Sequence, residues 1–201
     1  MPTTAPVDDP VRSRGAPPVL TPEAFARAFQ AQRPVFATLA AAVLGRRSDA
    51  EDVLQDACAV ALGKLDTFEV GTNFAAWMGQ IVRFVALNAL RRRQGRESLS
   101  PERIDESWLA APVAEEPADA RTLGELSRDQ EHFDDEVVAA LARLSPMARA
   151  CLLLRAVQDL DYSDLSKLLG IPEGTAMSHV HRARNALRVA LLSRGSRGGR
   201  P

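Results

Sequence analysis

Residues 175–188 combine cationic and hydroxyl-bearing side chains in a pattern that suits contact with a polyanion. The stretch holds three arginines and two histidines but no Asp or Glu. A guanidinium can pair with phosphate or with the two acceptors of guanine, and a serine hydroxyl can bond a base edge. If a helix begins just before this stretch, its first backbone N–H groups suit a phosphate. The candidate residues for an upstream DNA element are Glu173, Gly174, Thr175, Ser178, His179, Arg182 and Arg184.

The periodicity of residues 161–191 predicts the two helices that would position these side chains. A short helix with apolar Leu165, Leu168 and Leu169 is expected to start at the cap Ser163 and to end at Gly170. A longer helix follows from residue 172 or 173, and such a pair forms a helix-turn-helix whose second helix enters the major groove. The alternative is a compact helix pair with solvated arginines. The apolar positions of the longer helix are Ala176, Val180, Ala183, Leu187 and Leu191, opposite Thr175, Ser178, Arg182 and Asn185.

A second candidate surface lies on an expected helix in residues 48–65, with Ser48 and Glu51 as its capping box. Hydrogen-bond acceptors recur at helical spacing on one of its faces. Such a face suits a basic, arginine-bearing partner helix. The alternative is an acidic face that is merely solvated. The candidate acceptors are Asp49, Asp52, Gln55 and Asp56.

Residues 68–93 contain aromatic and cationic side chains of the kinds that bind unpaired DNA. Aromatic walls hold bases out of the stack, and cations grip the backbone. We expect Phe68, Asn73 and Trp77 to form a base pocket, although core packing is the favoured alternative for Trp77 and Phe74. The arginines can also complement the dipole of the helix that they end. The candidate cations are Arg83, Arg91, Arg92, Arg93 and Arg96.

The pattern of the whole chain predicts an all-α fold with two small helical domains joined by a flexible acidic linker. We expect Thr21, Asn73 and Ser145 to cap helices and Pro34 to mark a kink or a restart. We expect a disordered leader at 1–20, a first domain at 21–95, a linker at 96–132, a second domain at 133–193 and a basic disordered tail at 194–201. Residues 1–96, 97–136 and 137–201 carry net charges of +3, −10 and +6. A flexible linker of this length has an end-to-end distance of roughly 30–35 Å and a fully extended length of about 120 Å. It can therefore hold two domains two DNA turns apart, one turn being about 34–36 Å.

Other classes of function find little support in the sequence. The two cysteines, Cys58 and Cys151, stand among apolar residues and suit core positions rather than a disulfide or a metal site. The chain lacks a glycine-rich phosphate loop, a metal-ligand cluster and a nucleophile–base spacing, so we expect no enzymatic activity, no cofactor and no metal. No run of eighteen apolar residues occurs, so we expect a cytoplasmic protein without membrane insertion.

Taken together, these motifs resemble the bacterial RNA polymerase sigma factors of the extracytoplasmic-function (ECF) group. Residues 144–187, from LSPMARACLLLRAV to SHVHRARNAL, resemble region four of that family, and DAEDVLQDACAVAL with FAAWMGQIVRFVALNALRRR resembles region two. The resemblance implies that region four binds the upstream, minus-thirty-five promoter element. It implies that region two melts the downstream, minus-ten element. The implied partners are core RNA polymerase, through the clamp coiled coil of its largest subunit and its flap, promoter DNA, and an anti-sigma factor.

The chain departs from the family pattern at four positions. Met177 and His179 stand where a basic residue and an arginine are common, so upstream contacts should weaken. Phe84 stands where Asn is frequent beside the downstream base pocket, and Asn88 replaces a common Asp. Two alternatives to an initiation factor remain: a sigma-like decoy that sequesters an anti-sigma protein, and a helix-turn-helix regulator that acts without polymerase.

Overall fold

The structure is a computed structural model that describes residues 19–95 and 135–195 of the 201-residue chain. All regular structure in these two ranges is helical, as the sequence predicts. The predicted leader, linker and tail lie almost entirely outside the described residues. The helices are α1 (Pro22–Leu44), α2 (Ala50–Leu62), the short 3-10 helix η1 (Leu65–Thr67), α3 (Phe74–Arg93), α5 (Asp135–Ala142), α6 (Pro146–Val157), α7 (Tyr162–Leu169) and α8 (Glu173–Gly195).

Three helix starts follow directly from local sequence. The side chains of Thr21, Asn73 and Ser145 accept hydrogen bonds from the backbone N–H three residues on, at 3.2, 3.1 and 3.3 Å. Each bond satisfies one of the four N–H groups that a helix start leaves without an intrahelical partner. At the C-terminal end of α7, Gly170 adopts the left-handed conformation with φ 64°. These caps were all predicted, because capping depends on residues within one turn.

Two other predicted caps are wrong. Asp49, rather than Ser48, stands at the start of α2 and makes no side-chain cap bond, while the Ser48 hydroxyl donates to the Asp49 carboxylate at 2.8 Å. The cap of α7 is Asp161, two residues before the predicted cap Ser163, and its side chain accepts a hydrogen bond from the N–H of Asp164 at 2.7 Å. An aspartate and a serine are both good N-caps, so composition alone does not decide between them. Pro34, predicted to mark a kink or a restart, lies inside an uninterrupted α1.

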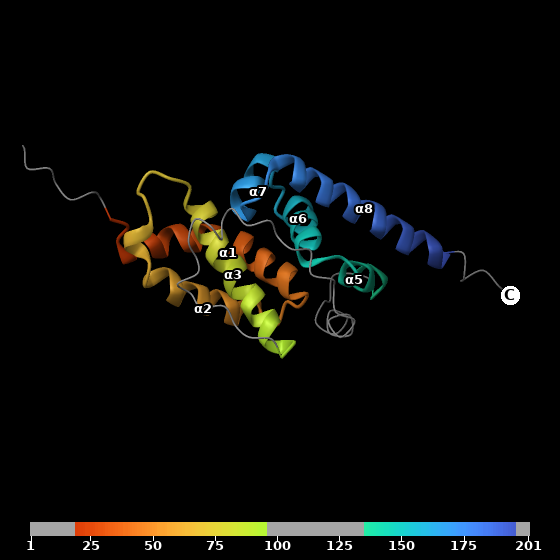
Figure 1. The fold of residues 1–201 in the computed structure, drawn as a ribbon, viewed down its shortest axis with the longest axis horizontal. Helices are drawn as coiled ribbons and strands as arrows, with labels where there is room; N and C mark the ends of the chain where they lie inside the picture. Colours follow the sequence, from red (N-terminus) through yellow and green to blue (C-terminus); the bar gives the residue numbers. More distant parts are fainter. Residues whose placement is uncertain (1–18, 96–134, 196–201) are drawn as a thin grey trace, which may run out of the picture.

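The helices form two groups that pack against each other (Figure 1). We call α1, α2 and α3 the first helical set, and α5, α6, α7 and α8 the second helical set. Helix α6 packs against α1, and α7 packs against α3. One cluster of buried apolar side chains contains residues of both sets, among them Phe36 and Met78 from the first and Leu154 and Leu168 from the second. A smaller cluster joins α5, α6 and α8 through Leu141, Leu144, Ala148, Leu152 and Ala183.

The contact between the sets is close enough to require glycine. A Cβ atom added to Gly79 on α3 would lie 2.7 Å from the carbonyl oxygen of Leu168 on α7. One added to Gly170 would meet the side-chain amide of Gln80. Across α1 and α6, the side-chain amide of Gln158 donates to the hydroxyl of Thr38 at 2.8 Å. The two predicted domains therefore meet in the structure across a tightly packed, partly polar surface.

Candidate nucleic-acid interface

Helices α7 and α8 form the predicted helix-turn-helix. Leu165, Leu168 and Leu169 of α7 are buried, and in α8 the buried residues include Ala176, Val180 and Ala183. The face of α8 opposite these residues points to solvent. A polar helix face with a buried apolar back is the geometry that a recognition helix needs. Of the predicted upstream residues, the exposed ones are Glu173, Gly174, Ser178, Arg182 and Arg184, and Thr175 is half-buried.

His179 does not join this exposed face. Only 5% of its surface is exposed, and its Nδ1 lies 3.4 Å from Nη2 of Arg182. In this arrangement a base edge has no access to the ring, so burial gives no support to the prediction that His179 contacts DNA. Met177, the other departure from the family pattern, is 49% exposed beside Ser178. The face of α8 that would enter the major groove of DNA thus carries the thioether of Met177 in place of a cation.

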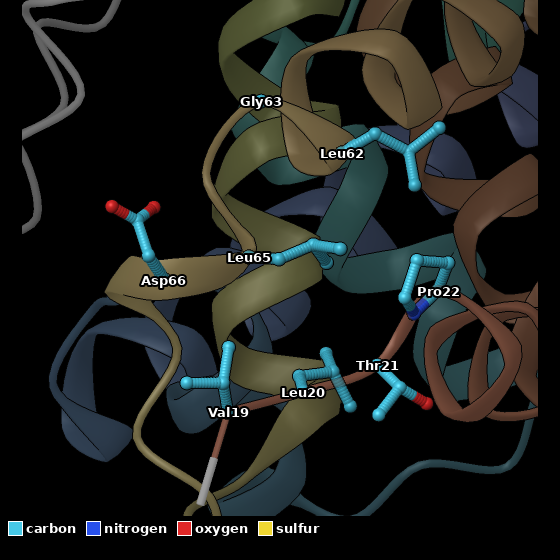
Figure 2. A pocket seen from close by; sticks show the side chains of 8 residues that line it. All are labelled: Val19, Leu20, Thr21, Pro22, Leu62, Gly63, Leu65 and Asp66. Atoms are coloured by element: carbon cyan, nitrogen blue, oxygen red, sulfur yellow. The ribbon is translucent and has the colours of Figure 1, made fainter. Parts of the chain in front are cut away.

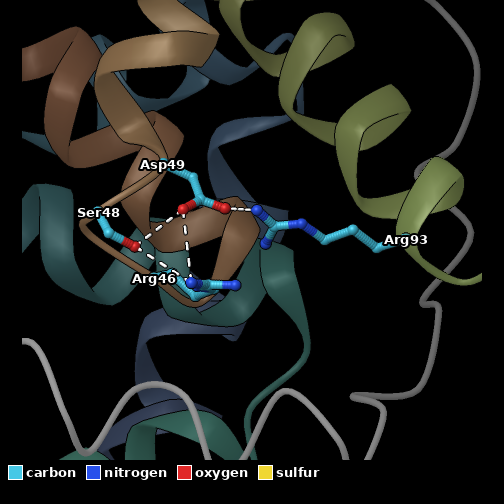
Figure 3. Close-up of polar contacts among 4 residues, drawn as sticks. All are labelled: Arg46, Ser48, Asp49 and Arg93. Atoms are coloured by element: carbon cyan, nitrogen blue, oxygen red, sulfur yellow. Dashed lines mark hydrogen bonds and ion pairs between the residues drawn. The ribbon is translucent and has the colours of Figure 1, made fainter.

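The predicted acidic face of α2 is only partly open. Asp52, Gln55 and Asp56 are exposed, whereas the side chain of Asp49 is only 18% exposed. Figure 3 shows the Asp49 carboxylate between the guanidinium groups of Arg93 and Arg46, the latter at 3.6 Å.

Two more arginines approach the same acidic face. Arg92 approaches Asp56 at 3.9 Å, and Arg33 pairs with Glu51. Arginines at the end of α3 thus neutralise part of the face that was predicted to bind a basic helix, because α2 and α3 pack side by side.

The aromatic side chains that were predicted to line a base pocket pack against one another and leave no pocket between them. The rings of Phe68 and Trp77 lie with centroids 5.2 Å apart, and both pack against Phe74 at 5.9 Å. Only 7% of Phe68 is exposed, so core packing, the favoured alternative for Trp77 and Phe74, applies to Phe68 as well. Asn73 is exposed, but its side chain caps α3. In this arrangement the aromatic residues close the core over α1, and they do not form an open pocket for a base.

Arg83 and Phe84 were predicted to contact downstream DNA, but both are buried. Arg83 is 2% exposed and donates through Nη1 to the carbonyl oxygen of Leu169, the last residue of α7. Burial lowers the pKa of Arg83 to about 10, so it stays charged at neutral pH. Phe84 is 1% exposed. Of the predicted downstream cations, Arg92 and Arg93 at the end of α3 are exposed, and Arg91 is half-buried.

Sequence reasoning missed the residue that joins α6 to the end of α1. Arg149 is 2% exposed and donates to the carbonyl oxygens of Ala42, Val43 and Leu141. Its position within the apolar run MARACLLL was a signal, because an arginine is almost never fully buried unless its donors are satisfied. Gly79 was a second sequence signal. A glycine inside a helix lowers stability by about 1 kcal/mol relative to alanine, so it often marks a close approach of another element to the helix.

An apolar groove of about 550 Å³ lies between the start of α1 and the end of α2 (Figure 2). Its lining includes Leu20, Pro22, Leu62 and Leu65, with Asp66 as its one charged side chain. None of the predicted site residues lines it. It lies at the opposite end of α2 from Asp49, so it forms no part of the candidate interface.

Two family models match the chain, and both describe parts of sigma-70 proteins. The model for sigma-70 region 2 matches residues 23–96, and the model for sigma-70 region 4 matches residues 134–187. The first range contains the first helical set, and the second contains most of the second set. No helix in the described parts of the chain is both long and apolar enough to cross a membrane.

Curated relatives and solved structures agree with these matches. The chain is 27% identical to the ECF RNA polymerase sigma factor SigW of Bacillus subtilis, over 74% of this chain and 79% of that protein. It is 29% identical to EcfG of Rhodopseudomonas palustris, with 81% and 82% coverage. It is 30% identical to SigE of Mycolicibacterium smegmatis but spans only 58% of that protein. The sigma factor RpoE of Bartonella quintana, solved with the anti-sigma factor NepR, superposes with a TM-score of 0.56 at 26% identity, covering 83% of this chain and 96% of that one.

Proposed function

We propose a function from the premise that the chain belongs to the sigma-70 family, in its ECF group of RNA polymerase sigma factors. It acts as a dissociable initiation factor that binds core RNA polymerase and directs it to promoters. It is not an enzyme in its own right, and it works where polymerase works, in the cytoplasm. The second helical set reads the upstream element, and the first binds polymerase and the downstream element.

The observation that carries this function is the exposed polar face of α8. Ser178, Arg182 and Arg184 are exposed on a helix whose other face is buried against α6 and α7. Arginines can contact phosphate and guanine, and the serine hydroxyl can bond a base edge. The start of α8, at Glu173 and Gly174, offers backbone N–H groups to a phosphate.

Polymerase binding is assigned to the acidic face of α2. Asp52, Gln55 and Asp56 are exposed and lie within two turns of one helix. Carboxylates at this spacing suit a partner helix that bears arginines, in keeping with the clamp coiled coil of the largest polymerase subunit. The flap of polymerase is the proposed partner of the second helical set. For the downstream element we retain Asn73 and Arg91–Arg93, which the present arrangement leaves at least partly accessible.

An inhibitory partner is also proposed. Bartonella quintana RpoE was solved with its anti-sigma factor NepR. By analogy, an anti-sigma protein regulates this chain. The decoy hypothesis makes a different prediction, since a decoy would capture such an inhibitor without binding promoter DNA together with polymerase.

The test is transcription in vitro with the purified chain, core RNA polymerase and genomic promoter fragments. Specific transcripts that depend on the chain are expected. The double variant Asp52→Arg, Gln55→Arg should bind core polymerase at least about tenfold more weakly, because it turns an acidic face basic, while its contact with upstream DNA persists. A matched control, Asp66→Arg with Thr67→Arg, makes the same change in charge at exposed residues of η1 and should bind polymerase normally.

The reciprocal variant is Arg182→Ala. It should weaken upstream DNA binding by about tenfold, the loss of one charged contact, while core binding is unchanged. Arg143→Ala removes an exposed arginine that lies outside α8, between α5 and α6, and serves as its control. Absence of any association with core polymerase, or of chain-dependent transcripts from every fragment, would refute the proposed function.

A further inference from the structure

The start of α8 presents a short row of exposed residues that contains no lysine or arginine. Figure 1 shows α8 along the outer edge of the second helical set, with α5, α6 and α7 packed on one side of it. In residues 173–181 the exposed positions are Glu173, Gly174, Met177, Ser178 and His181. A recognition helix contacts base edges mainly through its N-terminal residues. Guanine is most often read by Arg or Lys, so these turns of α8 lack the side chains that usually select it.

The next arginine along the chain, Arg182, lies on the other side of this row. Its Nη2 lies 3.4 Å from Nδ1 of the buried His179, and its Nε lies 3.4 Å from the carbonyl oxygen of Ser178. At about 100° per residue, His179 and Met177 project from α8 on opposite sides of Ser178. The guanidinium is therefore directed away from Met177, and it suits a phosphate beside the groove better than the base next to Met177.

Met177 gives this part of the helix an apolar contact. It is 49% exposed, one turn from Gly174 and next to Ser178. A methionine side chain is long and unbranched and its thioether is polarisable, so it can adjust to an apolar group that approaches it. In the major groove, the apolar group that distinguishes one base from the others is the 5-methyl group of thymine. An exposed thioether at the start of a recognition helix therefore favours thymine.

Gly174 leaves open space beside Met177. A Cβ atom added to Gly174 would meet no described atom within 4 Å, whereas one added to Gly79 or Gly170 would collide with another helix. Glycine is less favourable than alanine in a helix, and among the described residues neither packing nor a left-handed backbone requires it at position 174. A glycine of this kind permits another molecule to approach the backbone closely. The missing side chain leaves room for a base edge next to Met177.

The hydroxyl of Ser178 is oriented as a hydrogen-bond acceptor toward DNA. It donates its proton to the carbonyl oxygen of Gly174 at 2.8 Å, so its oxygen lone pairs remain for an outside donor. In the major groove adenine presents an amino group, and the thymine that pairs with adenine presents the methyl group. An acceptor and an apolar side chain on neighbouring residues thus complement an A·T base pair.

We propose that Met177 is a specificity-determining residue: its thioether packs against the 5-methyl group of one thymine in the upstream element, in the space that Gly174 leaves open. At this position the chain selects an A·T base pair, where an arginine would select guanine. This inference rests on the proposed function, since it specifies which base the upstream surface of α8 selects.

Three substitutions at Met177 test the assignment, and each changes an exposed side chain outside the buried clusters. Met177→Arg should select guanine at the same position, because a guanidinium pairs with the two acceptors of guanine. Met177→Ala should lose the preference, since its side chain is too short to reach the methyl group. Met177→Leu keeps an apolar side chain of similar volume and should retain it. Val157→Arg is the control, because it adds the same charge at an exposed apolar residue of α6, outside the helix-turn-helix.

The selection uses the full chain with core RNA polymerase and a promoter library whose upstream region is randomised. Wild type, Met177→Leu and Val157→Arg should enrich the same upstream sequence, with thymine at one particular position. Met177→Arg should enrich guanine over thymine at that position by about fivefold or more, and should leave the other positions unchanged. Met177→Ala should enrich the same bases elsewhere and show little preference at this position.

Replacement of that thymine by uracil isolates the methyl group, because the two bases differ by this group alone. The complex of wild-type chain and core polymerase should bind the uracil promoter about fourfold more weakly, the loss expected when one methyl group is no longer buried. The same replacement should have little effect on Met177→Ala. Uracil at a thymine outside the upstream element serves as the control on the DNA and should leave wild-type binding unchanged.

The possible outcomes separate this assignment from the proposed function. A guanine preference of Met177→Arg at a single position, together with the uracil effect in the wild type, supports the assignment. If wild type and all variants enrich one identical upstream sequence, or if wild type does not distinguish thymine from uracil, the assignment is overturned and the proposed function stands. If wild type with core polymerase enriches no upstream sequence and yields no chain-dependent transcripts, the proposed function fails and the assignment fails with it.

Discussion

At the scale of single residues, burial gives the two cysteines different chemistry. Cys151 is buried in the core shared by the two helical sets, and burial raises the pKa of its thiol to about 12. Cys58 is half-buried on α2, and its thiol pKa is raised by burial and by the charge of Glu51. The thiolate is the reactive form of cysteine. Of the two, Cys151 should therefore be the less reactive thiol in the folded chain.

We predict that a thiol reagent at pH 9 modifies Cys58 of the folded chain much faster than Cys151, and modifies both at similar rates in denaturant. With a pKa of about 12, roughly one Cys151 thiol in a thousand is ionised at pH 9. Mass spectrometry of modified peptides measures both rates. The same shift destabilises the fold in base, since the unfolded thiol ionises near its ordinary pKa of 9 while the folded one stays protonated to about 12. Equal labelling of the two cysteines in the folded chain would contradict the burial of Cys151.

Asp49 illustrates how far residue types can be interpreted from sequence. Its carboxylate was predicted to accept a charge-assisted hydrogen bond from a basic partner. In the structure Arg93 and Arg46 of the same chain make that contact. Sequence spacing identifies an acidic helix face, because helical periodicity is local. It does not reveal that an arginine 44 residues away will lie next to it, because that depends on how α3 packs on α2.

At the scale of elements, the start of α7 depends on one capping side chain. The carboxylate of Asp161 accepts the N–H of Asp164, and the left-handed Gly170 ends the helix after eight residues. A helix this short is marginal by itself, so its caps and its packing on α3 and α8 hold it together. The contact between α7 and α3 and the helix-turn-helix of α7 and α8 both depend on its position.

Asp161→Ala should lower the free energy of unfolding by about 1 kcal/mol, the usual cost of removing an N-cap. Asp161→Asn should be nearly neutral, because an asparagine oxygen can accept the same bond. Urea unfolding followed by circular dichroism compares the three proteins. If alanine and asparagine destabilise the chain equally, the negative charge at the start of the helix matters more than the cap bond.

Sequence predicted the elements well and their mutual packing poorly. Thr21, Asn73 and Ser145 were identified as caps because their partners lie three residues away. By contrast, Arg83 and Arg149 find their partners 86 to 107 residues away, in the other helical set. No periodicity encodes such a distance. The burial of Arg83 could not be predicted for this reason, whereas the core packing of Trp77 and Phe74 was the favoured alternative from the sequence.

At the scale of the whole molecule, the shared core couples the two helical sets. Leu154, Leu165 and Leu168 are packed in the same cluster as Phe36 and Ile81. Side chains that are buried only when the two sets pack together make each set more stable in this arrangement than it is by itself. Cooperative unfolding follows when one body loses its core as the other unfolds.

We predict that the free wild-type chain unfolds in one transition reported equally by both sets. A Trp108→Phe background leaves Trp77 of α3 as the only tryptophan, and Tyr162 of α7 is the only tyrosine. Trp77 fluorescence and the near-ultraviolet signal of Tyr162 should give the same urea midpoint. In Gly79→Ala the two midpoints should separate, because the sets no longer share buried surface. Distinct midpoints in the wild type would show that the shared core does not couple them.

The grip of Arg149 on α1 has an evolutionary corollary. The oxygens that it holds belong to peptide groups, which are the same whatever side chains stand at Ala42 and Val43. Lineages can therefore vary those side chains, within the space available, without changing the atoms that are gripped. If the two helical sets were exchanged between distant relatives, this contact between them could therefore form even where their promoter preferences have diverged.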